Sequence, residues 1–154
     1  MWRAEWFGDA HGPQVQLALL ARGWHVGYMN ANDMYGAPES MEHFDAYYRR
    51  VTGDYALESK MVMEGFSRGG LYAVNFAAVF PDRIAALYLD APAIDLRSWP
   101  GRAHSRWQEC LDSYGIVDSE TAVASVNPLG RIDDLIDASI PVIGVSGDSD
   151  RIVP

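Results

Sequence analysis

Apolar and polar positions follow one another in blocks that predict short buried strands separated by helices. Nearly continuous apolar runs of this length are typical of strands covered on both faces. They occupy residues 2–7, 24–29, 60–64, 84–89 and 140–146. Helical spacing of apolar residues fills three of the intervals, at residues 14–22, 40–51 and 71–80. Ser40 is the expected N-cap of the second helix, and Pro81 ends the third.

This alternation predicts an α/β protein with a doubly wound, mostly parallel sheet and helices on both faces. A length of 154 residues fits one domain, residues 1–154. Residues 93–139 are less regular, with helical pieces near 105–113 and 119–125. Such a segment leaves the sheet at the carboxyl ends of the strands, where ligands bind. It is therefore either a lid or pocket wall, or connecting helix packed on the sheet.

Composition and charge narrow the classes of function. Hydrophobic residues make up 49% of the chain, enough for a core. The formal charge of −9 is spread along the sequence, which argues against nucleic acid or an anionic membrane as partner. No apolar stretch reaches the roughly 18 residues of a membrane span, and no signal-peptide pattern opens the chain, so the compartment stays open. Cys110 is the single cysteine, and without metal-ligand or nucleotide motifs we expect no cofactor.

The most informative motif is Gly-x-Ser-x-Gly, formed by Gly65, Ser67 and Gly69 between an expected strand and an expected helix. This spacing is typical of the nucleophile elbow, a tight turn that lifts a serine hydroxyl off the end of a sheet. Side chains two residues before and after the serine are expected to clash with neighbouring backbone, which explains both glycines. The alternative is a glycine-rich turn that merely contains a serine.

Acyl transfer by Ser67 also needs an acid, a base and donors for the developing oxyanion. Asp150 follows the last expected strand and is the candidate acid, in the chain order serine, acid, histidine. Asp148 is its neighbouring competitor, with an Asx-type turn as the structural alternative. Asp90 and Asp95, after the fourth expected strand, are lesser candidates.

The expected oxyanion donors are backbone amides. One belongs to Arg68, directly after the serine and at a helix N-terminus that favours negative charge. The second should come from the end of the first strand, at about Glu5 or Trp6. Glu5 is alternatively a buried ion-pair partner of Arg3.

The base has no obvious candidate, because all four histidines precede Asp150. His25 lies in an expected strand and His43 near the start of an expected helix, where structural roles are typical. His11 lies in the loop beside the expected oxyanion donors, and His104 lies in the segment 93–139. Either of these two could approach Ser67.

Several stretches together resemble a bacterial branch of the α/β-hydrolase superfamily. They are residues 2–8, 23–26, 34–36, 65–71, 89–92, 97–101 and 147–154. The resemblance implies an eight-stranded core with Ser67 as nucleophile, Asp150 as acid and a histidine on a loop after the last strand. Compared with that pattern, the sequence lacks two antiparallel strands before Trp2 and the final strand, helix and histidine. We interpret it as the central part of such a domain.

These observations predict a serine hydrolase, foremost a carboxylesterase acting on a small acyl ester, such as that of a decorated carbohydrate. The mechanism would use an acyl-enzyme on Ser67 and a histidine from outside this sequence. Two alternatives stay open: a peptidase of the prolyl-oligopeptidase type, and a non-catalytic module that binds a ligand. Because sheet edges would lie exposed, we also expect the chain to self-associate.

Overall fold

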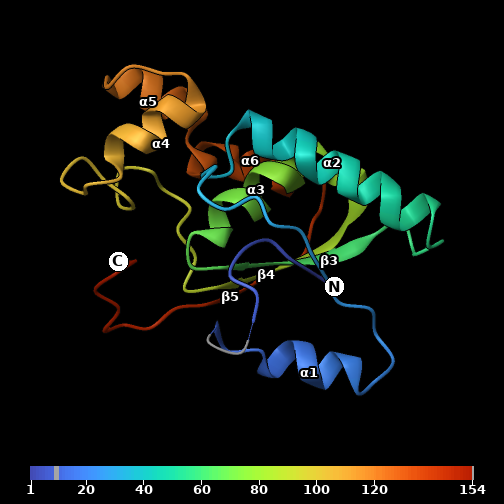
Figure 1. The fold of residues 1–154 in the computed structure, drawn as a ribbon. Coiled ribbons are helices and arrows are strands. Elements are labelled where there is room, and N and C mark those ends of the chain that lie inside the picture. Colours follow the sequence, from blue (N-terminus) through green and yellow to red (C-terminus); the bar gives the residue numbers. More distant parts are fainter. Residues whose placement is uncertain (9–10, 154) are drawn as a thin grey trace.

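The computed structural model describes residues 1–8 and 11–153. Its core is a five-stranded, all-parallel sheet with strand order β2-β1-β3-β4-β5. Strands β3, β4 and β5 are labelled in Figure 1. The strands are β1 (Trp2–Arg3), β2 (Gly27–Tyr28), β3 (Met61–Phe66), β4 (Ile84–Asp90) and β5 (Val142–Val145). The sequence-based prediction of an α/β fold with a parallel sheet is therefore confirmed.

Helices cover both faces of the sheet. Helix α1 (Gln14–Leu20) lies on one face, whereas α2 (Pro38–Gly53), α3 (Gly69–Val79) and α6 (Ile132–Asp137) lie on the other (Figure 1). Helix α3 is apolar nearly all round and packs directly on β3 and β4, so Leu71, Val74 and Phe76 are fully buried. Burial of this helix places its N-terminus at the carboxyl end of β3.

The strand order sets where a site can form. From β1 the chain moves to the edge position β2, then crosses back over β1 to β3 and continues to β4 and β5 in the other direction. The loops after β1 and β3 therefore leave the sheet toward opposite faces, and the crevice between them is the usual ligand site of doubly wound sheets. Sheets with this order carry several chemistries, so the order indicates the place of a site and not its reaction.

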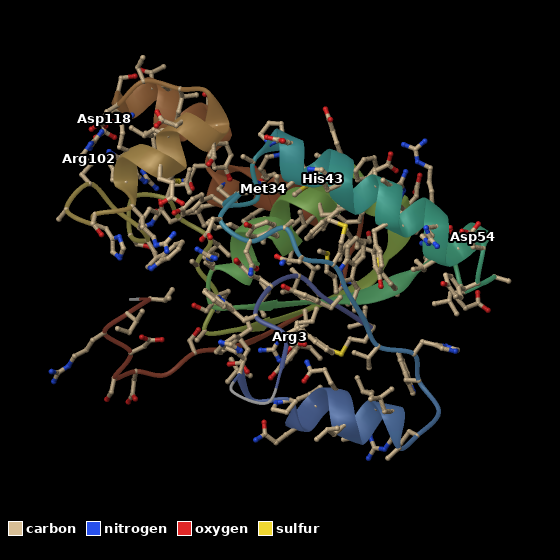
Figure 2. All side chains as sticks on the ribbon, viewed as in Figure 1. Arg3, Met34, His43, Asp54, Arg102 and Asp118 are labelled. Carbon is tan, nitrogen blue, oxygen red and sulfur yellow. The ribbon has the colours of Figure 1, made fainter. Side chains whose placement is uncertain are left out.

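The irregular segment 93–139 forms α4 (Trp107–Tyr114), α5 (Glu120–Val126), a 3-10 turn (Pro128–Arg131) and α6. The two expected helical pieces are thus present. Helices α4 and α5 form an outlying pair near the start of α2 (Figure 1). The Arg102–Asp118 ion pair joins the loop before α4 to the connection between α4 and α5 (Figure 2). Trp107 of α4 strengthens this pair, since its indole nitrogen donates to Asp118 at 3.1 Å.

Three expectations about element bounds are wrong. The first strand covers only Trp2–Arg3, and Trp6 beyond it takes a left-handed backbone with φ 57°. The second strand covers only Gly27–Tyr28, so His25 lies before it. Helix α2 begins at Pro38, whose fixed φ suits the first helical position. Ser40 is therefore not its N-cap, and its hydroxyl donates to the Ala37 carbonyl oxygen instead.

Strand β5 is an open edge of the sheet in the part of the chain that the structure describes. Its side chains are exposed on both faces, with Ile143 65% and Val145 50% accessible to solvent. Among the described residues, no helix is long and apolar enough to cross a membrane.

Candidate functional site

Ser67 occupies a strained turn between β3 and α3. Its backbone is left-handed, with φ 52°, which costs a residue with a side chain about 1–3 kcal/mol. Two hydrogen bonds hold this geometry: the Ser67 amide donates to the Asp90 carbonyl oxygen at 2.9 Å, and the Ala93 amide donates to the Ser67 carbonyl oxygen at 2.8 Å. The end of β4 and the loop after it therefore keep the partly buried serine in place.

Two positions near the serine have no room for a side chain, and only one of them is an expected position. A Cβ at Gly65 would lie 2.9 Å from the Gly70 Cα atom, so that position tolerates no side chain. At Gly69 the closest atoms, in Glu5, are 3.5 Å away, an ordinary contact, and the expected clash at Gly69 is wrong. Gly70 is the second constrained position, because a Cβ there would lie 2.5 Å from the Ala93 carbonyl oxygen. The sequence signal for this second position was the glycine that directly follows Gly69.

The end of β1 lies beside this turn. The backbone nitrogen of Glu5 is 3.5 Å from the Cβ position of Gly69, which brings the two loops of the crevice into contact. Within the described part of the chain, the amides of Glu5, Trp6 and Arg68 have no hydrogen-bond acceptor. Unpaired amides at the start of a helix favour negative charge. The structure thus brings together the residues predicted as oxyanion donors.

Arg68 and Glu5 form a buried ion pair at this place. The guanidinium Nε donates to Glu5 Oε1 at 2.7 Å, and both side chains are at most 3% exposed. Arg68 also bonds Asp33 Oδ1 at 2.7 Å and lies over the Trp6 ring at 4.5 Å. The Glu5 carboxylate is not the ion-pair partner of Arg3, which pairs with Glu64 on the α1 side of the sheet (Figure 2). Arg3 Nε instead donates to the Glu5 carbonyl oxygen at 3.2 Å.

Burial dominates the electrostatics of Glu5. Loss of water raises its pKa from 4.5 to about 7, although the hydrogen bonds from Arg68 act in the opposite direction. Its second carboxylate oxygen has no partner among the described residues. Asp33 is half exposed, and Arg68 holds the pKa of this carboxyl below its ordinary value.

Asp150 lies in the loop after β5, at the carboxyl end of the sheet. Its Oδ1 accepts hydrogen bonds from the amides of Ile152 and Val153 at 2.8 and 3.0 Å, which lowers the pKa of the carboxyl. The Asx-type turn expected of Asp148 is therefore made by Asp150. Such bonds keep a carboxylate ionised and fixed, as the acid of a triad must be. Pro154, which ends the stretch 147–154, lies outside the described residues.

The lesser acid candidates have structural roles. Asp90 accepts a hydrogen bond from the Tyr88 hydroxyl at 3.2 Å, and its carbonyl oxygen anchors Ser67. Asp95 is held by Arg97 at 2.8 Å and by the side-chain amide of Asn127, also at 2.8 Å. Both carboxylates therefore organise the loop after β4.

No histidine in the described part of the chain is hydrogen-bonded to Ser67 or Asp150. His11 lies beside one of the candidate oxyanion donors, since its ring stacks on Trp6 with centroids 5.3 Å apart. His11 Nδ1 is buried and has no partner among the described residues. His104 Nδ1 accepts from the Arg106 amide at 3.0 Å, which occupies that nitrogen.

The remaining candidate chemistry is limited. Among residues 1–8 and 11–153, no group of three histidine, cysteine or acidic side chains is placed to hold a metal ion. Burial raises the pKa of the Cys110 thiol to about 12, so it stays protonated at neutral pH. A thiol in this state is a packing residue rather than a nucleophile.

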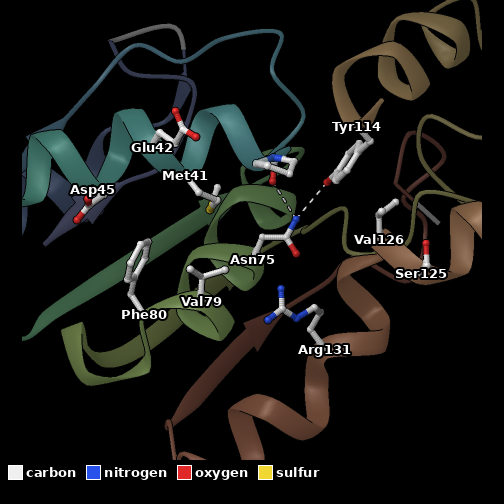
Figure 3. A pocket seen from close by; sticks show the side chains of 12 residues that line it. Met41, Glu42, Asp45, Asn75, Val79, Phe80, Tyr114, Ser125, Val126 and Arg131 are labelled. Carbon is white, nitrogen blue, oxygen red and sulfur yellow. Dashed lines mark hydrogen bonds between the residues drawn. The ribbon is translucent and has the colours of Figure 1, made fainter. Parts of the chain in front are cut away.

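Two cavities lie away from the elbow. The first has a volume of about 410 Å³ between α2, α3 and α5, where the Asn75 amide nitrogen donates to the Gly36 carbonyl oxygen and the Tyr114 hydroxyl (Figure 3). The second, of about 960 Å³, lies at the amino ends of β1 and β3. Neither is lined by Ser67 or Arg68, so neither belongs to the candidate site.

No protein-family model matches this chain, and no curated protein matches its sequence. The fold and the site define an α/β protein with a strained serine at the crevice of a doubly wound sheet.

Proposed function

We propose that the protein is a serine hydrolase of the α/β-hydrolase type, with Ser67 as its nucleophile. The observation that supports this most is the left-handed Ser67 beside the unpaired amides of Arg68, Glu5 and Trp6. Strain of this kind persists only where surrounding structure enforces it, and it concentrates at functional sites. Ser67 differs from Ser139, which is also left-handed, in its place at the crevice beside these unpaired amides.

The proposed reaction is hydrolysis of a small acyl ester, of which an ester on a decorated carbohydrate is one candidate. The Ser67 hydroxyl attacks the ester carbonyl carbon while a histidine takes its proton. The amide of Arg68 and one from Glu5 or Trp6 donate to the oxyanion, and each such donor is worth about 10²–10³ in rate. The tetrahedral intermediate then expels the alcohol, and water releases the acid from the acyl-enzyme. Asp150 would orient the histidine.

The test is covalent labelling with a fluorophosphonate, which reacts with activated serines. Protein from the complete reading frame should be labelled, and Ser67→Ala should abolish the labelling. Ser139→Ala is the matched control, because Ser139 is also left-handed, with φ 54°, but lies at the end of α6. Labelling that survives Ser67→Ala, or that is lost equally in Ser139→Ala, would contradict the proposal.

One observation favours a second candidate, a non-catalytic module that binds a ligand: no described histidine is bonded to Ser67. Saturable ester hydrolysis separates the two functions, because a triad without its base retains only about 10³–10⁴-fold catalysis over water. Turnover of acetyl esters by the complete protein would support the hydrolase. Cleavage of aminoacyl anilides without ester hydrolysis would instead favour a peptidase of the prolyl-oligopeptidase type.

A further inference from the structure

The Arg68 side chain is held from several directions. Its Nε and one terminal nitrogen both contact Glu5 Oε1, at 2.7 and 2.5 Å, while the other terminal nitrogen contacts Asp33 Oδ1 at 2.7 Å. The guanidinium carbon lies 4.5 Å from the Trp6 ring centroid and 5.7 Å from that of Tyr35. These contacts join three segments: the end of β1, the elbow and the loop before α2.

The same residues carry the backbone amides at the crevice. Arg68 contributes one amide, and Glu5 and Trp6 contribute the others. The Glu5 and Trp6 side chains that contact the guanidinium therefore belong to the same backbone segment that must face the Arg68 amide. A change in this ion pair would alter the separation between the two sets of amides. Oxyanion stabilisation depends on donors held about 2.7–3.1 Å from the developing charge. Small displacements of this backbone should therefore be costly for catalysis.

Stability alone does not account for such a pair. Burying two charges costs several kcal/mol for each ion, and well-packed apolar residues of similar volume are often as good or better. Arg68 and Glu5 are nevertheless 3% and 1% exposed. Asp33 extends the pair to Arg106 of the segment 93–139, with an N–O distance of 2.9 Å. The arrangement specifies geometry at the elbow.

We propose that the Arg68 side chain is a positioning residue that holds the Glu5–Trp6 backbone against the Arg68 amide and so sets the shape of the oxyanion hole. This inference rests on the proposed hydrolase function. The guanidinium touches neither substrate nor the reacting atoms in this role. It acts through the backbone of its partners.

The test compares variants that keep the Arg68 amide. Arg68→Met preserves the length of the side chain and loses the ion pair, so kcat should fall about 10–100-fold, less than loss of a whole donor. KM should change by less than about threefold, because the donors act mainly in the transition state. Arg68→Lys keeps a charge without the planar fork and should recover part of the rate. The fluorophosphonate labelling rate should fall in parallel with kcat.

Arg83→Met is the matched control. Arg83 also pairs with a carboxylate, Asp45 at 2.5 Å, and lies over two rings, Tyr48 at 4.2 Å and Phe80 at 3.9 Å. It joins α2 to the end of α3, away from the elbow. Its loss should lower the melting temperature without changing kcat.

The outcomes separate the inference from the function on which it rests. If the unmodified protein shows no Ser67 labelling, the hydrolase function fails first. If it is labelled and Arg68→Met reacts at the same rate, or Arg68→Met and Arg83→Met lose rate equally, the positioning role is overturned. Glu5→Gln, which keeps the shape of its side chain, covers the case in which Arg68→Met does not fold. An unchanged kcat in a folded Glu5→Gln protein would likewise overturn the role.

Discussion

At the scale of single residues, the candidate site depends on conformations and charges that are costly in isolation. Ser67 is left-handed, and Glu5 and Arg68 are charged groups removed from water. Hydrogen bonds to the end of β4 and the loop after it hold the serine, and the two ions pair through Glu5 Oε1. The sequence predicted the serine turn, because Gly65 and the flanking strand and helix are local signals. It did not predict the Glu5–Arg68 pair, whose members are 63 residues apart.

The raised pKa of Glu5 predicts a dependence of stability on pH. Burial raises this pKa from 4.5 to about 7, so between these values the native state binds more protons than the unfolded chain. The free energy of unfolding contributed by Glu5 is therefore largest below pH 4.5 and falls as the pH rises to 7. Relative to Glu5→Gln, which does not titrate, the loss should be on the order of 1–3 kcal/mol. Urea denaturation at several pH values measures it, and a constant difference would contradict the assignment.

At the scale of elements, the site depends on how closely α3 approaches the loop after β4. This approach leaves no room at Gly70, where a Cβ would lie 2.5 Å from the Ala93 carbonyl oxygen and 2.8 Å from Pro92. Gly69, one position earlier, has only ordinary contacts. The Gly-x-Ser-x-Gly motif predicted a steric need for glycine at Gly69. The packing of α3 against the loop after β4 instead excludes a side chain at Gly70.

The two glycines give a matched pair of substitutions. Gly70→Ala should lower the free energy of unfolding by about 1–3 kcal/mol, since the loop or the helix must move. Gly69→Ala should leave it unchanged or raise it by up to about 1 kcal/mol, because alanine favours the helical conformation. Urea denaturation of both variants distinguishes them. Equal destabilisation would show that the close approach is not rigid.

At the scale of the whole molecule, the strand order brings the residues of the candidate site together and leaves β5 as an open edge of the sheet. The carboxyl ends of β1 and β3 meet at the crevice, and the loop with Asp150 follows β5 at the carboxyl ends of the parallel strands. Strand β5, by contrast, presents unpaired backbone and exposed apolar side chains within the described chain. Such an edge is a template for pairing with another strand.

The open edge predicts self-association of the 154-residue chain. Ile143→Lys places a charge on β5 and should shift the sedimentation profile toward the monomer. Ile136→Lys is the control, because Ile136 is also 65% exposed but lies on α6. A chain that is already a sharp monomer, or an equal effect of both lysines, would refute the prediction.

The sequence by itself determined the α/β class, the parallel sheet and the strand–turn–helix around Ser67, because each follows from apolar periodicity and local glycine chemistry. The tertiary structure alone decided which distant groups meet at that turn: Glu5 with Arg68, Arg3 with Glu64, and the Ala93 carbonyl with Gly70. Strand order sets these neighbours. That order arises from packing the whole chain, so no local pattern specifies it.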